Sequence, residues 1–75
     1  MDSEVTPNTR IAFQERGVDQ FGRRGWIGRP GWVMRGGMEK ATKELQRLRN
    51  LRPSGVFRIV PLFGNETGEF SPETV

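Results

Sequence analysis

The chain has 75 residues, of which 33% are hydrophobic and 28% are charged, and its formal net charge is +3. A domain this short buries only about 60% of the surface of its unfolded chain, so its core is thin and it is either marginally stable or stabilised by a partner. Cysteine and histidine are absent, which excludes disulfides, thiolate metal sites and the commonest ligand of transition metals. No run approaches the roughly 18 apolar residues of a membrane span, and the polar start does not follow the signal-peptide pattern, so we expect a cytoplasmic protein with no membrane partner.

The charge is unevenly distributed along the chain. Residues 1–19 carry a net charge of −2, residues 20–58 carry +8 and residues 59–75 carry −3. A cationic middle between two acidic ends indicates an acidic partner. Ten of the twelve basic residues are arginine, however, and a GC-rich genome produces that bias without selection for binding, so both explanations stay open.

The first two predicted elements are a flexible N-terminal segment, residues 1–8, and a strand. In TRIAFQER, residues 9–16, Ile11 and Phe13 alternate with outer-face residues, which predicts a half-buried strand. The glycine-rich residues 17–31 then predict a long basic loop with a short extended piece at the Trp-Ile pair.

The next elements are a strand, a helix and a strand. GWVMR, residues 31–35, follows a proline that marks the edge of a strand. MEKATKELQRLRNL, residues 38–51, predicts an amphipathic helix, and VFRIVPL, residues 56–62, predicts a strand rich in β-branched and aromatic residues. Residues 63–75 are predicted to be a flexible acidic tail. The expected apolar face of the helix consists of Met38, Ala41, Leu45 and Leu48, and Leu51 extends it.

These elements predict an α+β fold with one small ββαβ domain over residues 9–62. A helix that joins the second and third strands makes a right-handed crossover, so those strands should be parallel. If the first strand pairs with both, it is central, and the result is a three-stranded mixed sheet of order 2-1-3. The helix would pack on one face of this sheet and leave the other face open.

The sequence argues against catalysis. It contains no His, Cys or Tyr, and its three serines are Ser3, Ser54 and Ser71, two of them in the predicted tails. A general acid–base site needs convergent, partly buried groups, and no such set is apparent. The glycine spacing matches neither G-x-G-x-x-G after a strand nor GK[ST]. We therefore expect no enzyme, no cofactor and no metal site.

The features that favour binding are the arginines and tryptophans of FGRRGWIGRPGWVMRGG, residues 21–37. Arginine neutralises phosphate and tryptophan stacks on unpaired bases, and both are enriched at protein–protein hot spots. Alternatively, one tryptophan completes the thin core, and the one in the predicted strand is the better candidate. The candidate partner-binding residues are Arg23, Arg24, Trp26, Arg29, Trp32 and Arg35.

The predicted helix offers a second basic patch. Lys40, Lys43 and Arg47 are spaced by three and four residues, so they share a face. Such a face steers acidic partners by its electrostatic field. The alternative is a solvated helix face with no binding role.

The segment WVMRGGMEKATKELQRLRNLRPSGVFRIVPL, residues 32–62, resembles small, mostly uncharacterised accessory proteins of actinobacterial phages. In these, a strand ending in an aromatic–aliphatic pair precedes a helix rich in Glu-Leu-x-Arg-Leu and a strand of the FRIV type. The resemblance implies a short protein, made in the host cytoplasm during infection, that binds and modulates a host macromolecule. It transfers no site residues.

We therefore expect a non-enzymatic binding module that docks on a host protein through the basic aromatic loop. Nucleic-acid binding through the same arginines and tryptophans is the first alternative. A structural or capsid-associated role is the second.

Overall fold

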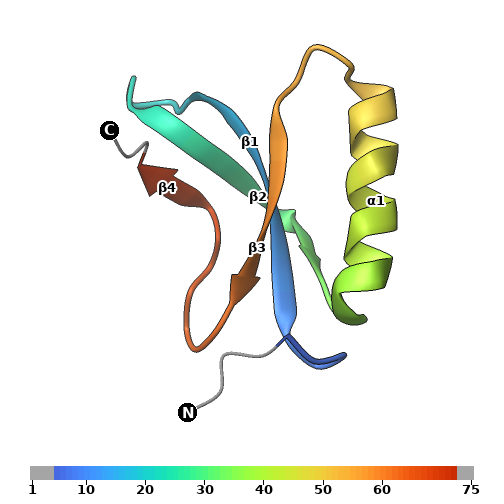
Figure 1. Ribbon diagram of the computed structural model, residues 1–75. Coiled ribbons are helices and arrows are strands. Elements are labelled where there is room, and N and C mark those ends of the chain that lie inside the picture. Colours follow the sequence, from blue (N-terminus) through green and yellow to red (C-terminus); the bar gives the residue numbers. More distant parts are fainter. Residues whose placement is uncertain (1–4, 73–75) are drawn as a thin grey trace.

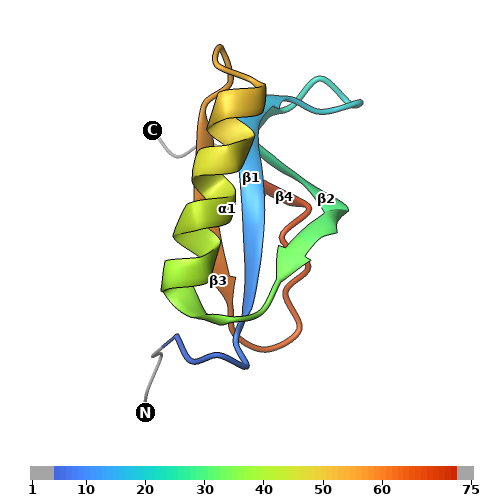
Figure 2. The ribbon, with the colours of Figure 1, turned by 90° about the vertical axis from the view of Figure 1, so that its right-hand side faces the viewer.

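The fold is a four-stranded sheet with one helix on one face (Figure 1). The computed structural model describes residues 5–72, apart from the side chain of Pro30. Figure 2 shows the helix lying over the middle and one edge of the sheet. The elements in chain order are β1 (Arg10–Val18), β2 (Arg24–Met34), α1 (Gly37–Leu51), β3 (Phe57–Leu62) and β4 (Phe70–Pro72).

The predicted α+β class is confirmed, but the predicted three-stranded mixed sheet is wrong. β1 lies between β2 and β3 and is antiparallel to both, as expected. The strand order is β3-β1-β2-β4, because β4 adds to the outer edge of β2 through pairs such as Ile27 with Phe70. Every pairing in the sheet is therefore antiparallel.

The segment predicted as a basic loop, residues 17–31, is mostly strand. β1 and β2 form a hairpin that closes between Val18 and Arg24, so only the five residues 19–23 make the turn. The glycines misled the prediction because they serve close packing here. A Cβ added to Gly25 would lie 2.4 Å from a backbone oxygen of the C-terminal segment, and one added to Gly28 would lie 2.0 Å from another. Glycine in a strand allows another backbone to approach this closely.

An irregularity divides β2 into two halves. Between the pairs Gln14–Gly28 and Ala12–Val33, residues 29–32 of β2 face a single residue of β1. A proline lies in this bulge, where a missing N–H disrupts no ladder. The first half of β2 pairs with β4, and within residues 5–72 the second half has no strand on its outer side.

The main core lies between α1 and the sheet. The predicted helix stripe is buried at three of its five positions, whereas Met38 is 41% and Leu51 is 64% exposed. The strand alternation of Ile11 and Phe13 is confirmed, since both are buried against the helix. Four half-buried side chains extend the core at its margin. The buried cluster consists of Ile11, Phe13, Ala41, Leu45, Leu48 and Phe57, with Val5, Trp32, Met34 and Ile59 packed against it.

The face away from α1, which was expected to be open, is crossed by the segment that follows β3. Gln14 is fully buried there, and its Nε2 donates hydrogen bonds to the carbonyl of Gly68 (3.1 Å) and to Oγ of Ser71 (3.1 Å). At the other end of the segment, Arg10 donates to the carbonyls of Gly64 (2.7 Å) and Glu66 (2.9 Å). Residues 63–72 are thus part of the folded unit, and the predicted domain end at residue 62 is corrected.

The predicted N-terminal segment is also attached to the domain where the structure describes it. Val5 packs against the core, and the carbonyl of Pro7 accepts a hydrogen bond from the N–H of Gly36 (3.0 Å). Residues 1–4 and 73–75 of the two predicted tails lie outside the described residues.

Candidate functional site

The turn between β1 and β2 holds the first predicted site residue, Arg23, in place. Asp19 accepts hydrogen bonds from the backbone N–H groups of Phe21 (2.9 Å) and Arg23 (2.8 Å), and from Nε of Arg23 (2.7 Å). Burial acts to raise the pKa of Asp19, but these hydrogen bonds outweigh it and hold the pKa below its ordinary value of 3.8. The guanidinium of Arg23 also lies over the rings of Phe21 and Phe70, at 5.4 and 4.4 Å from their centres. Arg23 therefore organises the turn.

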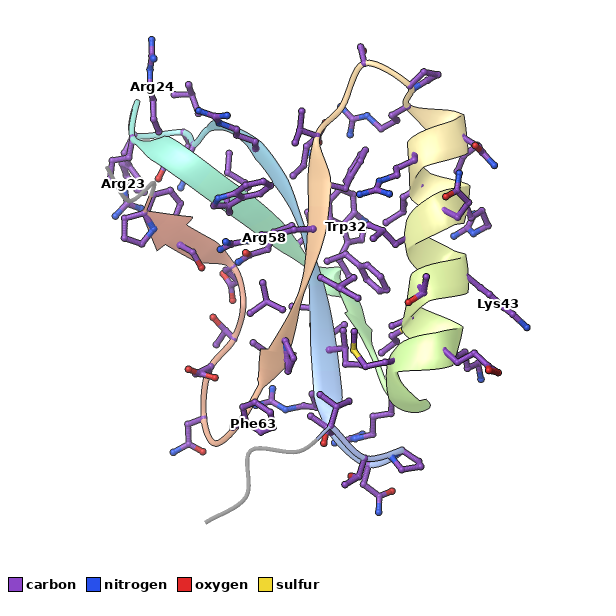
Figure 3. All side chains as sticks on the ribbon, viewed as in Figure 1. Arg23, Arg24, Trp32, Lys43, Arg58 and Phe63 are labelled. Atoms are coloured by element: carbon purple, nitrogen blue, oxygen red, sulfur yellow. The ribbon has the colours of Figure 1, made fainter. Side chains whose placement is uncertain are left out.

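Trp26 lies on the face of the sheet away from α1. Its ring is covered by Arg58, whose guanidinium carbon lies 4.4 Å from the ring centre. Nε of Arg58 also donates to Oε1 of Gln14 (2.9 Å), and burial lowers the pKa of Arg58. Figure 3 shows Arg58 reaching from β3 across this face toward β2.

Trp32 lies on the opposite face, between the sheet and α1 (Figure 3). Its ring centre is 6.1 Å from that of Phe57, and the two planes are tilted by 57°. The guanidinium carbon of Arg29 also lies 5.5 Å from the Trp32 ring centre. The two indoles are thus separated by the sheet and do not form one surface.

A groove lies between the second half of β2 and α1, with a volume of about 510 Å³. Apolar side chains from both elements line it, and cationic side chains stand among them. We call it the β2–α1 groove. Its lining residues are Phe13, Gly31, Trp32, Val33, Met34, Arg35, Lys40, Glu44, Arg47 and Leu48.

The β2–α1 groove has a positive net charge. Both carboxylate oxygens of Glu44 accept hydrogen bonds from Arg47, which lowers the pKa of Glu44 below its ordinary value of 4.5. Arg35 donates one hydrogen bond, from Nε to the carbonyl of Asn8 (3.2 Å). Among residues 5–72, the ammonium group of Lys40 has no hydrogen-bond or ion-pair partner. Two cations, Arg35 and Lys40, thus face a groove whose one carboxylate is already neutralised.

The structure therefore joins part of the predicted loop site to part of the predicted helix patch. Trp32, Arg35, Lys40 and Arg47 meet in the β2–α1 groove, and Arg29 stacks on the indole at its margin. The remaining predicted residues lie elsewhere. Arg23 and Arg24 are at the hairpin end, Trp26 is on the other face, and Lys43 points away from the sheet on the outer side of α1 (Figure 3).

Sequence reasoning missed the apolar part of the groove. Met34 follows Trp32 by two residues, and Leu48 follows Glu44 by four. Strand and helix periodicity places each pair on one face, so these spacings were a usable signal. The sequence pattern does not specify which strand α1 faces across the groove.

No protein-family model, curated protein or solved structure matches the chain. Within residues 5–72, the helix is neither long nor apolar enough to cross a membrane. In the same part of the chain, no three Asp or Glu side chains gather in a way that could hold a metal ion. The chemistry of the groove itself is therefore the basis for assigning a function.

Proposed function

We propose that the chain is a non-enzymatic binding module that holds an acidic segment of a partner protein in the β2–α1 groove. The observation that carries the proposal is the meeting of Trp32, Arg35 and Lys40 in one groove. An aromatic anchor beside aliphatic surface, with cations at its rim, is the composition that dominates protein–protein binding energy. The rim cations select carboxylates on the partner and steer its approach.

The geometry favours a protein over a nucleic acid as the partner. Single-stranded nucleic acids stack successive bases on aromatic side chains along one basic surface. Trp26 and Trp32 lie on opposite faces of the sheet, and Arg58 covers the ring of Trp26. Arg23, which would contact phosphate, is paired with Asp19 at 2.7 Å.

The resemblance to phage accessory proteins bears on the source of the partner. It implies a protein of the bacterial host, met in the host cytoplasm. An acidic host protein would then be bound and modulated by occupation of the groove.

The experiment is capture of partners from bacterial lysate on the immobilised full chain, with and without nuclease. The test variant is Lys40→Glu, in the groove, and the matched control is Lys43→Glu, on the same helix but pointing away from the sheet. A partner bound in the groove should resist nuclease, lose about tenfold or more in affinity with Lys40→Glu, and be retained by Lys43→Glu. Tenfold corresponds to about 1.4 kcal/mol, within the range of a close charge pair.

A second matched pair tests the strand side of the groove. Arg35→Glu should weaken capture as Lys40→Glu does, whereas Arg24→Glu, at the hairpin end, should leave it unchanged. Capture that disappears with nuclease and falls steeply with salt would support nucleic-acid binding instead. Capture that depends on Arg24 and not on Lys40 would overturn the groove as the site.

A further inference from the structure

The outer edge of the second half of β2 has no neighbouring strand in residues 5–72. β4 pairs with β2 only over Gly25–Ile27, and the N–H of Gly28 still donates to the carbonyl of Glu69 (2.9 Å). Beyond this point, Val33 and Met34 pair with β1 on their inner side alone. Figure 2 shows this half of β2 at the right-hand margin of the sheet. An unpaired edge presents backbone donors and acceptors that another chain can use.

Gly31 lies on this edge, exposed, and lines the β2–α1 groove. Its backbone is outside the left-handed region, and a Cβ added to it would meet nothing within 4 Å. Neither conformation nor internal packing therefore requires glycine here. The first half of the same strand shows what glycine does in β2, since Gly25 and Gly28 admit the backbone of the C-terminal segment. Gly31 therefore leaves open space beside the β2–α1 groove, which a side chain at this position would fill.

The bulge and Pro30 limit how far an added strand could extend. Proline lacks the N–H that a ladder requires, and bulges commonly protect exposed edges. The usable edge is therefore short, since only Val33 and Met34 are in register with β1, and Gly31 and Trp32 precede them within the bulge. A ladder this short gives few hydrogen bonds, so binding also needs side chains in the adjoining groove.

We propose, on the basis of the proposed function, that the partner segment binds as an added β-strand along Gly31–Met34. Alternate side chains of this strand enter the β2–α1 groove. Aliphatic groups contact Trp32 and Met34, and carboxylates meet Arg35 and Lys40. The occupant is thus an extended peptide in which aliphatic and acidic residues recur at every second position.

Charge complementarity supports an acidic occupant. Arg29, Arg35 and Lys40 surround the free edge and the groove, and the carboxylate of Glu44 is already held by Arg47. The chain's own carboxylates at positions 66 and 69 belong to the segment that crosses the opposite face. They do not neutralise the groove.

The probe is a displayed library of random decapeptides, selected on the full chain, with the best peptide then resynthesised for fluorescence polarisation. Selected peptides should be rich in Asp or Glu alternating with Val, Ile or Leu. On binding, the amides of residues 32–34 should gain protection from hydrogen exchange. Enrichment of basic or non-alternating peptides would count against the proposal.

Matched variants locate the peptide. Gly31→Val should weaken binding at least tenfold, because its side chain would occupy space beside the groove. It should not lower the thermal unfolding midpoint, because a Cβ there meets nothing within 4 Å and a β-branched residue suits a strand. Gly17→Ala, also in a strand, places a Cβ at an ordinary 3.6 Å from Ile27 and should bind like the wild type. Lys40→Glu should weaken binding and Lys43→Glu should not.

Backbone N-methylation of the peptide at alternate residues separates strand addition from binding in the groove alone. One of the two alternating methylation patterns should abolish binding, because it removes the donors that face β2. If Lys40→Glu weakens binding while both methylated peptides and Gly31→Val leave it intact, strand addition is wrong and the proposed function survives. If binding is insensitive to Lys40→Glu and Arg35→Glu, both proposals fail.

Discussion

The guanidinium carbon of Arg58 lies 4.4 Å from the centre of the Trp26 ring, and Nε of the same residue donates to the buried amide of Gln14 (2.9 Å). These contacts connect β3, β2 and β1 on the face away from α1. Gln14 extends them to Gly68 and Ser71 of the C-terminal segment. One buried amide thus holds the C-terminal segment against the sheet.

Gln14→Leu is expected to lower the free energy of unfolding by about 2–3 kcal/mol. The substitution keeps the approximate volume but leaves Arg58, Gly68 and Ser71 without their shared partner, and unpaired buried polar groups are costly. Urea denaturation measures the change. Gln46→Leu, on the exposed side of α1, should alter the free energy by no more than about 0.5 kcal/mol. Equal effects of the two variants would show that the network contributes nothing.

The stability of the turn is expected to depend on pH through Asp19. Its folded-state pKa lies below 3.8, so the carboxylate binds protons less readily in the folded chain than in the unfolded one. The stabilisation is therefore present above pH 3.8 and is lost as the pH falls through the folded pKa. Asp19→Asn should remove this part of the pH dependence. An NMR titration of the side-chain carboxyl that gives a value at or above 3.8 would contradict the hydrogen-bond pattern of the turn.

The two tryptophans are expected to differ in their contribution to stability. Trp32→Ala removes a side chain that packs on Phe57 and the core, and should cost about 3 kcal/mol. Trp26→Ala removes a ring outside that core and its contact with Arg58, and should cost about 1–2 kcal/mol. Denaturant titration of each variant, followed by circular dichroism, measures both values. A larger loss for Trp26→Ala would mean that the face away from α1 is the main core.

The elements with a clear period were predictable from the sequence. The spacing of Ala41, Leu45 and Leu48 gave the helix and its buried face, and the alternation of Ile11 and Phe13 gave the helix side of β1. Each of these patterns reports burial against a neighbour that is itself apolar. Local periodicity is enough in such cases.

The elements that depend on distant backbone were not predictable in the same way. Glycines at 25 and 28 read as loop signals, although they allow the C-terminal segment to pass close to β2. Gln14 follows Phe13 in the strand and so falls on the face away from the helix, but its burial depends on carbonyl and hydroxyl groups more than fifty residues away. For a similar reason, the sequence predicted two separate sites, one in the loop and one on the helix. No local pattern shows that Trp32 and Lys40 line one groove.

Two glycines of the C-terminal segment offer a matched test of whether close packing against a distant strand requires glycine. Gly64 and Gly68 both have positive φ, at 96° and 71°, so alanine is strained at either position. A Cβ at Gly64 meets nothing within 4 Å, whereas one at Gly68 would lie 2.6 Å from the Cβ of Ala12, a methyl fixed on the central strand. Gly64→Ala should therefore cost about 1–2 kcal/mol from strain alone. Gly68→Ala should cost about 1–3 kcal/mol more and should speed amide exchange at Phe70 and Ser71. Equal losses in urea denaturation would mean that the segment does not cross the sheet as closely as the fold requires.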